Sequence, residues 1–497
     1  MSPALFTCLV ALLSIAAYAL HRLYFDPLSR FPGPKAAALT RVWYFWHLAR
    51  GDLPLTVRKL HDQYGPFVRI APDELSCISP AAWRDVYTRA AGRPEMQKDP
   101  RFFEHDNLNG HRSIVGADIE EHKRLRKMMA HGFSDQALRE QRPLLSSYID
   151  VLMAKLDDLA QQGQPADLVS WYNFYTFDVI GHLTFGSPFG CLATSALDSW
   201  IAVIFDSIRA GLLSQAFSHW PVLQPFAGLL LPRALQARLS AHNAATQLKT
   251  SARIAAQKTT TTPDFLGKLI ANDLPADSIA VNARTLVTAG SETAASVMSA
   301  LTFLLLTHRA CLGRLGREVR DAFASAEDIA PEEVARLPYL EACIRETFRM
   351  RPPVAGAVPR VTPAGAGAVV DGTWVPGGVS VGVWQLAAYR SAANFADADR
   401  FVPERWLDDA PAQFARDRKE VVQPFSVGAR DCIGRNLAWL ELRLVIANLL
   451  WRFDMELDPQ SARWDEQKVY FNWERKPLWV KLKKRVSGDS TDGLLRP

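Results

Sequence analysis

Apolar residues recur three or four positions apart over most of the chain, which is the spacing of one face of a helix. This periodicity predicts helices over residues 136–160, 197–215, 277–308 and 331–350. Strand-like alternation, broken by turn-forming residues, is found mainly at residues 66–79, 354–384 and 466–483. The pattern therefore predicts a mainly α-helical fold with small β-sheets.

The pattern continues without an internal repeat or an obvious linker, which predicts one large domain. The chain has 497 residues, of which 48% are hydrophobic, and this is enough for a large core. One low-complexity segment, KTTTTPD at 258–264, is typical of a loop between helices. The glycine-rich GAGAVVDG at 365–372 lacks both the G-x-G-x-x-G spacing and a following helix. The sequence therefore shows no flavin or nicotinamide site of its own.

An uncharged, mostly apolar run of 17 residues, Ala4–Leu20, stands near the N-terminus. Its length is close to the minimum for a spanning helix, about 17 residues, and suits a thin bilayer such as that of the endoplasmic reticulum. The tripeptide AYA at 17–19 is an alternative signal-peptidase site, but no Lys or Arg precedes the run. Basic residues follow it instead, at Arg22, Arg30, Lys35 and Arg41. We therefore expect a single-pass anchor with the body of the protein facing the cytoplasm.

The anchor is followed by RFPGPK at residues 30–35, in which two prolines flank a glycine. This composition ends a helix and forms a stiff turn. We therefore expect three parts: a transmembrane anchor at residues 1–24, a proline-rich hinge at 25–40 and the main domain at 41–497.

Cysteine usage and charge narrow the class of protein. The six cysteines are scattered and form no C-x-x-C pair, which favours free thiols in a reducing compartment. They are Cys8, Cys77, Cys191, Cys311, Cys343 and Cys432. The net charge of +5 is small for this length, so no nucleic-acid partner is indicated.

One cysteine lies in an unusual setting, the segment PFSVGARDCIGRNLAWLELRL at residues 424–444. Apolar residues spaced three and four apart, from Leu437 to Trp451, predict an amphipathic helix that starts near Cys432. A helix N-terminus favours a thiolate over a thiol, and the thiolate is the form that binds a metal. Cys432 is therefore a candidate metal ligand.

The residues around this cysteine fit the same interpretation. Gly428 suits a turn, and Gly434 lets the helix approach a flat, bulky group. Arg430 offers a planar guanidinium to a carboxylate, and Phe425 is placed to cover the sulfur. A lone cysteine is more often an inert small hydrophobe. Phe, Gly, Arg and Gly at fixed offsets favour the metal ligand.

These residues form FSVGARDCIG at 425–434, which matches F-x-x-G-x-R-x-C-x-G, the heme-binding signature of the cytochrome P450 superfamily. The chain resembles this family over essentially its whole length. The resemblance implies a cytochrome P450 fold and a heme b whose iron is axially ligated by Cys432. The segments FDPLSRFPGPK and FDVIGHLTFG are similar in style to the microsomal enzymes of filamentous-fungal secondary metabolism.

A second motif, AGSET, begins at Ala289. Gly290 in a helix interior costs on the order of 1 kcal/mol relative to Ala, and an acid and an alcohol interrupt an apolar run. The resemblance places Ala289 over the distal side of the heme, in a widened turn with room for O₂. It implies that Thr293 hydrogen-bonds to the oxygen being reduced and that Glu292 helps to deliver protons. A mid-helix Thr can instead bond to the carbonyl four residues earlier, with the acid solvated. The next residue is Ala, where the family usually has Thr or Ser.

A third motif lies in EACIRETFRMRPP, where Glu346 and Arg349 are one turn apart. On a surface such a pair contributes only a few tenths of a kcal/mol. The spacing matches the family's E-x-x-R element, and FVPERW supplies Arg405 as its partner. The resemblance therefore implies a buried, structural network of these three residues.

Heme propionates are carboxylates and need cationic donors. The segment EEHKRLRKMMAHGFS resembles the family's helix with a W-x-x-x-R element, here with His122 in place of Trp and Arg126 as the arginine. Arg360, in AVPRVTP, matches the propionate arginine that follows the E-x-x-R helix, and Arg430 is the third. Each arginine taken alone would more often be a surface residue.

By the family's layout, the substrate pocket draws on the loop at 102–116, the segment 205–217, Leu286 with Ala289, Val354–Val358 and the turn near Phe471. Several of these parts are apolar, so we expect a lipophilic substrate, although each residue could equally belong to the core. The apolar residues concerned are Phe102, Phe103, Ile114, Phe205, Leu212 and Phe217.

The resemblance implies a membrane-bound heme-thiolate monooxygenase that acts on a terpenoid, polyketide or alkaloid intermediate. Its electrons would come from NADPH through a separate NADPH–cytochrome P450 reductase. Two other classes stay open: a heme-thiolate isomerase or dehydratase that uses no O₂, and a non-catalytic heme carrier or sensor. The acid and alcohol at Glu292 and Thr293 favour the monooxygenase, because the other two classes do not need them.

Overall fold

The computed structural model describes residues 2–89, 92, 94–103, 107–198, 201, 211, 215, 218–220, 222, 233–258, 264–474 and 476–485. The helix expected at 197–215 and the loop expected at 258–264 lie largely outside these residues. The α-helices are α1 Pro3–Leu20, α2 Lys35–Leu39, α3 Val42–Arg50, α4 Leu53–Tyr64, α5 Pro80–Tyr87, α6 Ile119–Met129, α7 Asp135–Glu140, α8 Arg142–Gln161, α9 Leu168–Phe185, α10 Cys191–Thr194, α13 Arg233–Ala255, α14 Gly267–Ala271, α15 Ala276–Thr307, α16 Arg309–Ala322, α17 Pro331–Val334, α18 Pro338–Met350, α19 Gln385–Tyr389 and α20 Arg435–Arg452.

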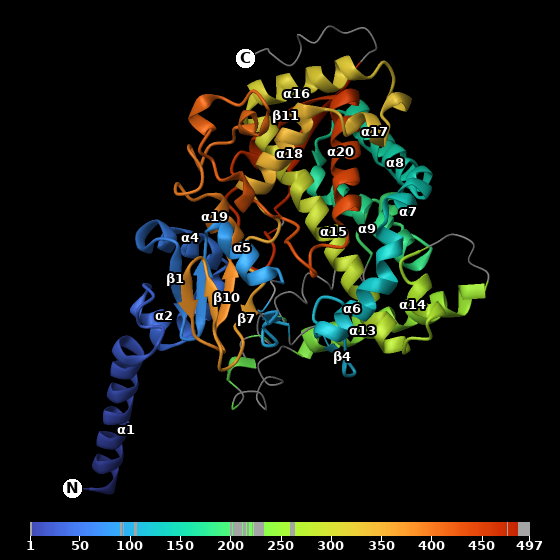
Figure 1. The fold of residues 1–497 in the computed structure, drawn as a ribbon. Helices are drawn as coiled ribbons and strands as arrows, with labels where there is room; N and C mark the ends of the chain where they lie inside the picture. Colours follow the sequence, from blue (N-terminus) through green and yellow to red (C-terminus); the bar gives the residue numbers. More distant parts are fainter. Residues whose placement is uncertain are drawn as a thin grey trace.

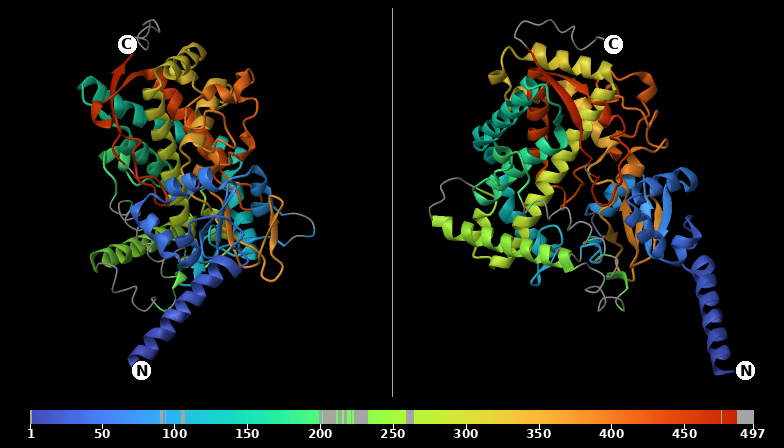
Figure 2. Two further views of the ribbon diagram at one scale, coloured as in Figure 1. Left: turned by 90° about the vertical axis from the view of Figure 1, so that its left-hand side faces the viewer. Right: turned by 180° about the vertical axis from the view of Figure 1, so that it is seen from behind.

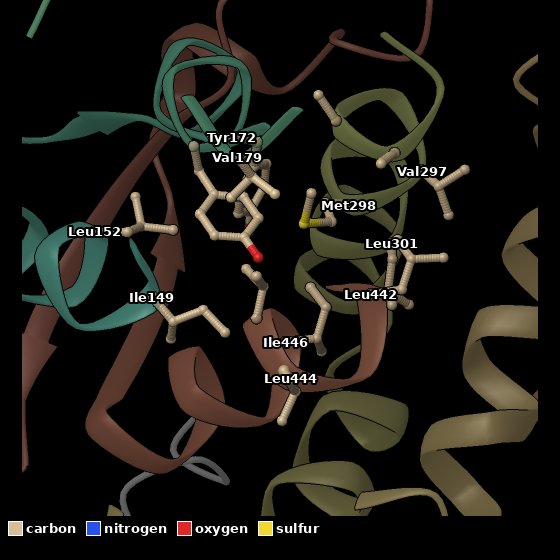
Figure 3. Packing of buried hydrophobic residues seen from close by; sticks show 14 of the residues in the cluster. Ile149, Leu152, Tyr172, Val179, Val297, Met298, Leu301, Leu442, Leu444 and Ile446 are labelled. Carbon is tan, nitrogen blue, oxygen red and sulfur yellow. The ribbon is translucent and has the colours of Figure 1, made fainter. Parts of the chain in front are cut away.

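The helical part of the molecule is built around α15, which runs through its centre (Figure 1). α15 packs against α9 and α20, and α9 is buried on nearly all sides, as expected of a helix enclosed by others. Figure 3 shows side chains of α8, α9, α15 and α20 that meet in one buried cluster. Among them are Ile149, Tyr172, Val179, Met298, Leu301 and Ile446. The predicted helical core is confirmed.

Two helices that the periodicity predicts as continuous are each divided. The region 136–160 forms α7 and α8, which meet at Gln141, and α8 has a proline in its first turn. The region 331–350 forms α17 and α18, both of which also begin with a proline. Proline has no N–H to continue a preceding helix but fits the first turn of a new one. The apolar spacing continues across both breaks, so periodicity alone did not reveal them.

The described strands form small sheets, the largest of which lies beside α4 and α5 (Figure 1). The largest sheet has the strand order β1-β2-β10-β7-β3, with β1 Phe67–Ala71, β2 Glu74–Cys77, β10 Ser380–Val383, β7 Arg360–Val361 and β3 Gln97–Lys98. A second sheet joins β11 Phe453–Leu457, β12 Trp479–Lys484 and β6 Ala166–Asp167. Two hairpins pair β4 Asn107–Leu108 with β5 His111–Arg112, and β8 Ala368–Val370 with β9 Thr373–Val375. Strand β11 lies outside the predicted strand regions because it follows α20 directly.

The N-terminal helix extends away from the rest of the molecule (Figures 1 and 2). None of the residues of α1, all of which are described, is buried, and the segment Pro3–Phe25 is long and apolar enough to cross a membrane. α15 passes the same test of length and composition, but it is mostly buried and belongs to the core. The exposed apolar helix is consistent with a membrane anchor.

The segment after the anchor lies against the globule. Leu28 and Phe31 are buried, and Asp26 is 3.4 Å from the guanidinium of the buried Arg69. A Cβ atom at Gly33 would stand 2.3 Å from the carbonyl oxygen of Arg69, so only glycine allows this approach. The first part of the proline-rich segment is therefore packed on the sheet.

The predicted network of Glu346, Arg349 and Arg405 is confirmed. All three side chains are fully buried, and Glu346 accepts hydrogen bonds from Arg349 at 2.8 Å and from Arg405 at 3.1 Å. Arg405 also pairs with Asp417, and Trp406 Nε1 donates to Glu346 at 2.8 Å. The network joins α18 to the segment that leads toward Cys432. Its role is structural.

Replacing Arg405 with Ala leaves Glu346 and Asp417 buried without a shared cation. We expect a loss of about 3–5 kcal/mol in the free energy of unfolding, measured by urea denaturation. Arg400→Ala is the control, because Arg400 is 73% exposed and meets Asp397 only at 3.5 Å. That variant should lose less than about 1 kcal/mol. Equal losses in the two variants would contradict a structural role for the network.

Candidate functional site

Cys432 lies in a loop whose shape depends on Gly428. The Cys432 N–H donates to the carbonyl oxygen of Phe425 at 2.8 Å, which closes the loop. Gly428 has φ of 82°, and a Cβ atom there would stand 2.3 Å from the carbonyl oxygen of Tyr87. Only glycine satisfies both the backbone angle and this contact with the end of α5. The loop is thereby held against α5.

The helix that follows, α20, begins at Arg435, so Cys432 lies three residues before it and Gly434 is the N-cap. A Cβ atom at Gly434 would be 4.0 Å from the sulfur, and its absence keeps that side of the thiol open. Desolvation by the surrounding protein raises the pKa of Cys432, while the Gly434 N–H and the charges of Arg126 and Arg435 lower it. The helix N-terminus thus favours the thiolate, as expected, but its effect is smaller than that of desolvation. A bound metal cation reverses this balance.

Two small side chains at the candidate site are exposed. Cys432 is one of them, and Ala289, in the middle of the mostly buried α15, is the other. Exposure at such positions is the condition for contact with a bound group. In this respect both residues fit their expected places beside a heme.

Four cationic side chains surround the buried imidazole of His122. Burial is the main cause that lowers the pKa of His122, to about 3, and the charges of Arg430, Lys98, Arg126 and Arg360 lower it further. The imidazole is therefore neutral at physiological pH. The structure thus places the predicted residues His122, Arg126, Arg360 and Arg430 close together.

The cations come from separate elements and are only partly paired. Arg126, on α6, pairs with Asp431 at 2.6 Å, and Arg430 Nη1 donates to the carbonyl oxygen of Ala117 at 2.8 Å. Arg360 is buried, and its Nη1 has no hydrogen-bond partner among the described residues. Burial lowers the pKa of Arg360 to about 10. A buried donor without an acceptor is expected where a ligand carries the acceptor. The two carboxylates of heme fit this set of donors.

Sequence reasoning did not identify Lys98. Its strand, β3, pairs with β7 so that Lys98 stands directly opposite Arg360. Its Nζ donates to the carbonyl oxygen of Val115 at 2.6 Å. No local motif marks this lysine, because the register of two short strands brings it to the cluster.

On α15, the motif residues point to different neighbours. Thr293 Oγ1 donates to the carbonyl oxygen of Ala289 at 2.7 Å. Glu292 is buried, and Asn472 Nδ2 donates to its Oε2 at 3.4 Å. Asn472 belongs to a turn near the C-terminus, and no motif in the sequence marks it. The acid is therefore held toward that turn rather than solvated.

The expected widened turn is absent, because α15 is a continuous α-helix across the motif. Gly290 instead allows close packing of two helices. A Cβ atom at Gly290 would stand 2.8 Å from Cδ1 of Ile180 on α9. The free-energy cost of a glycine within the helix is thus offset by packing.

A small pocket, with a cavity volume of about 30 Å³, brings together several of the expected substrate-contacting parts. Phe102, Val354 and Phe471 line it, and the rings of Phe102 and Phe471 are 5.9 Å apart. Other expected pocket residues belong to buried hydrophobic clusters or are packed against neighbouring rings: Phe103, Ile114 and Leu286. Phe205, Leu212 and Phe217 lie outside the described residues.

Comparison with known proteins identifies the family. The family model described as Cytochrome P450 matches residues 32–482. The chain is 40% identical to cytochrome P450 monooxygenase astJ of Aspergillus oryzae, over 95% of both chains. It is 40% identical to cytochrome P450 monooxygenase atr2 of Stereocaulon alpinum, over 93% of this chain and 92% of that one. It is 39% identical to averantin hydroxylase of Aspergillus parasiticus, over 96% of both. The chain therefore belongs to the cytochrome P450 family, the heme-thiolate monooxygenases.

Proposed function

We propose that this cytochrome P450 is a membrane-anchored monooxygenase of fungal secondary metabolism that oxidises a lipophilic small molecule. The reaction is RH + O₂ + NADPH + H⁺ → ROH + H₂O + NADP⁺, with the electrons delivered by a separate NADPH–cytochrome P450 reductase. The observation that carries this proposal is the position of Thr293, one helical turn after the exposed Ala289 and beside the buried acid Glu292. Such a pair can hold and pass protons.

The residues around Cys432 would hold the heme, which supplies the iron centre that activates O₂. Cys432 would ligate the iron, and Phe425, whose carbonyl oxygen accepts from the Cys432 N–H, would cover the sulfur. Gly428 and Gly434 keep the backbone and the face of the group in place. This division of roles follows the contacts of the loop.

The cationic cluster would bind the two propionates. Arg126, Arg360 and Arg430 donate charge-assisted hydrogen bonds, and Lys98 adds a fourth cation. His122, kept neutral by burial and by these charges, offers a ring N–H without adding to the positive charge. An additional cation would have increased the repulsion that the cluster already contains.

Thr293 would control where a proton goes. Its hydroxyl donates to the Ala289 carbonyl in the structure, and rotation about χ1 can redirect that proton toward O₂ held beside Ala289. Glu292 would resupply the proton, and Asn472 would keep its carboxylate in place. In this proposal the acid and the alcohol would act in sequence.

The relatives indicate the kind of substrate. One is named a hydroxylase of averantin, and others are named only as monooxygenases. The apolar side chains that line the pocket support a lipophilic substrate, which we propose is a terpenoid, polyketide or alkaloid intermediate. The anchor, residues 1–24, and the following segment, 25–40, would place the domain at 41–497 on the cytoplasmic side of the endoplasmic reticulum membrane.

The two alternative classes differ from a monooxygenase in what they consume. An isomerase or dehydratase of the same fold would turn over without O₂ or reductase. A heme carrier or sensor would consume no NADPH. Incubation of the purified enzyme with reductase, NADPH and an extract of host metabolites distinguishes the three classes by oxygen uptake, NADPH use and new oxidised products.

Cys432→Ser should abolish the thiolate-specific absorption band of the ferrous carbon-monoxide complex, because serine does not provide a sulfur ligand. The measurement is the difference spectrum of the purified variant. Cys311→Ser is the control, since Cys311 is partly buried at a distance from the loop and packs against the helical core. Its spectrum should match that of the wild type. A wild-type band in Cys432→Ser would refute this ligand.

Deletion of residues 1–24 should release the protein from membranes while heme binding is kept, because no residue of α1 is buried. Tyr18 Oη donates to the carbonyl oxygen of Leu39 at 3.1 Å, a contact on the surface of the globule. This deletion also removes Arg22, which pairs with Asp26 and whose carbonyl accepts from Arg69 at 3.1 Å. A form that lacks only residues 1–20 keeps these contacts. It should unfold at a higher temperature than the form that lacks residues 1–24. Carbonate-resistant membrane association of both truncated forms would argue against a single N-terminal anchor.

Thr293→Ala should keep heme and substrate binding but lose control of proton delivery. We expect less product per NADPH consumed and more hydrogen peroxide. A positioned proton donor contributes about 10² to 10⁴ in rate, and a water molecule can replace part of it. The control is Thr288→Ala, because Thr288 makes the same bond to the carbonyl four residues earlier. If Thr293→Ala keeps wild-type coupling, Thr293 is only a helix residue.

A further inference from the structure

A short loop, residues 113–117, follows the β4–β5 hairpin and precedes α6. Several of its backbone N–H groups are turned inward. Those of Gly116 and Ala117 donate to the carbonyl oxygen of Ser113, at 3.1 and 2.8 Å, and that of Val115 donates to Ser113 Oγ at 3.1 Å. Ser113 and Ala117 are buried. The loop is therefore a compact turn whose later carbonyl groups can accept hydrogen bonds from other elements.

Two members of the cationic cluster donate to carbonyl oxygens of this loop. Lys98 Nζ donates to that of Val115 at 2.6 Å, and Arg430 Nη1 donates to that of Ala117 at 2.8 Å. Lys98 belongs to β3 and Arg430 to the loop that carries Cys432, so the turn joins two separate parts of the chain. A backbone carbonyl group orients a cation without adding a negative charge. The two cations are therefore positioned while their charge is kept for an anion.

The side chain of Asn282 fixes this loop to α15. The Ile114 N–H donates to Asn282 Oδ1 at 2.8 Å, and Asn282 Nδ2 donates to the carbonyl oxygen of Ser278, one turn earlier, at 2.8 Å. These partners allow one orientation of the amide, because an N–H needs an acceptor and a carbonyl needs a donor. Asn282 is fully buried, and Ile114 is buried as well. Without this side chain, the Ile114 N–H would lose its acceptor away from solvent, which costs free energy.

Asn282 also shares one face of α15 with the residues assigned to the O₂ side of the heme. Leu286, Ala289 and Thr293 follow it after four, seven and eleven residues, which is the spacing of a single helical face. The hairpin that leads into the loop packs against α15 as well. The same helix face thus carries Thr293 and holds the loop that orients two of the cations.

We propose that Asn282 is a positioning residue for the heme: by holding the 113–117 loop on α15, it sets the places of Lys98 and Arg430 and of the propionates that they bind. This inference rests on the proposed function, because it concerns the same heme site. Asn282 acts through the loop and not by contact with the heme. Loss of its bond to Ile114 lets the loop and both cations shift, so the propionates are held less tightly.

The test uses the full-length, heme-loaded ferric enzyme in detergent, without substrate, reductase or NADPH, and measures the rate of heme transfer to excess apomyoglobin. We expect Asn282→Ala to lose heme roughly 3- to 10-fold faster than the wild type, as for the loss of one hydrogen bond. The reduction potential of the iron should also fall, because the ferric form is more stable when cations lie farther away. Failure of monooxygenase activity would not affect these measurements, so the two proposals are tested separately.

Asn448→Ala is the matched control. Asn448 is also a buried helical asparagine, and its Nδ2 donates to the carbonyl oxygen of Leu444 at 3.0 Å, but in the described part of the chain it bonds only within its own helix. It should lose heme at the wild-type rate. If Asn282→Ala does not take up heme, Asn282→Ser should show the same acceleration. The serine hydroxyl can still bond to the Ser278 carbonyl, but it ends one bond short of the amide oxygen that meets Ile114.

A double-mutant cycle with Lys98→Met separates positioning from a general loss of stability. Lys98→Met should itself lose heme faster than the wild type. If Asn282 acts through this cation, the factor by which Asn282→Ala accelerates heme loss should be smaller in the Lys98→Met background. We expect a decrease of at least about twofold, the lower end of coupling within one network. A change that only weakens the fold would multiply the rate by the same factor in both backgrounds.

Four results would overturn the proposal. One is heme loss from Asn282→Ala at the wild-type rate. Equal acceleration in Asn448→Ala would show a general effect of removing a buried asparagine. An unchanged factor in the Lys98→Met background would show that Asn282 acts independently of the cation. Failure of both Asn282 variants to fold, judged by circular dichroism, would indicate a purely structural residue.

Discussion

The positive charge gathered around the buried His122 is the constraint on which the proposed heme site depends. Lys98, Arg126, Arg360 and Arg430 act together on His122, and only part of their charge is answered within the described chain. Arg126 pairs with Asp431, whereas Arg430 meets the carboxylate of Glu95 only at 3.8 Å. Cations left unpaired in a low-dielectric interior are costly. Binding of a doubly negative group therefore stabilises the local fold as well as holding the group itself.

In the Glu346 network, unlike the cations around His122, positive and negative charges are matched. Glu346 is met by two guanidinium groups and an indole N–H, and Asp417 by Arg405. Since the strong donors and acceptors there are matched, this network holds α18 and the segment around Arg405 without a ligand. That segment continues into the loop that carries Cys432. The Glu346 network, whose charges are matched within the chain, thus supports the loop that carries Cys432. The cations around His122, by contrast, need a ligand to match their charge.

The parts of this organisation that could be predicted are those encoded within a few residues of each other. The cysteine loop, the acid and alcohol on α15 and the Glu346 network all have short, fixed spacings. The role of Gly290 could not be predicted, because it depends on Ile180 of another helix. Lys98 depends on the register of β3 against β7, and Asn472 on the fold of a distant turn. The helix end lowers the pKa of Cys432, as the sequence indicates, but desolvation by residues from other elements raises it by more.

One turn of α15 divides its residues among three neighbours. Gly290 faces α9, Glu292 faces the turn that contains Asn472, and Ala289 with Thr293 lies on a partly exposed side. The turn that holds Glu292 also supplies Phe471 to the wall of the pocket. The position of the acid and the shape of the pocket are therefore set by the same few residues. Because close packing fixes α15 against α9, variation in the 470–474 turn changes the pocket and the surroundings of Glu292 together, while the helix itself stays in place.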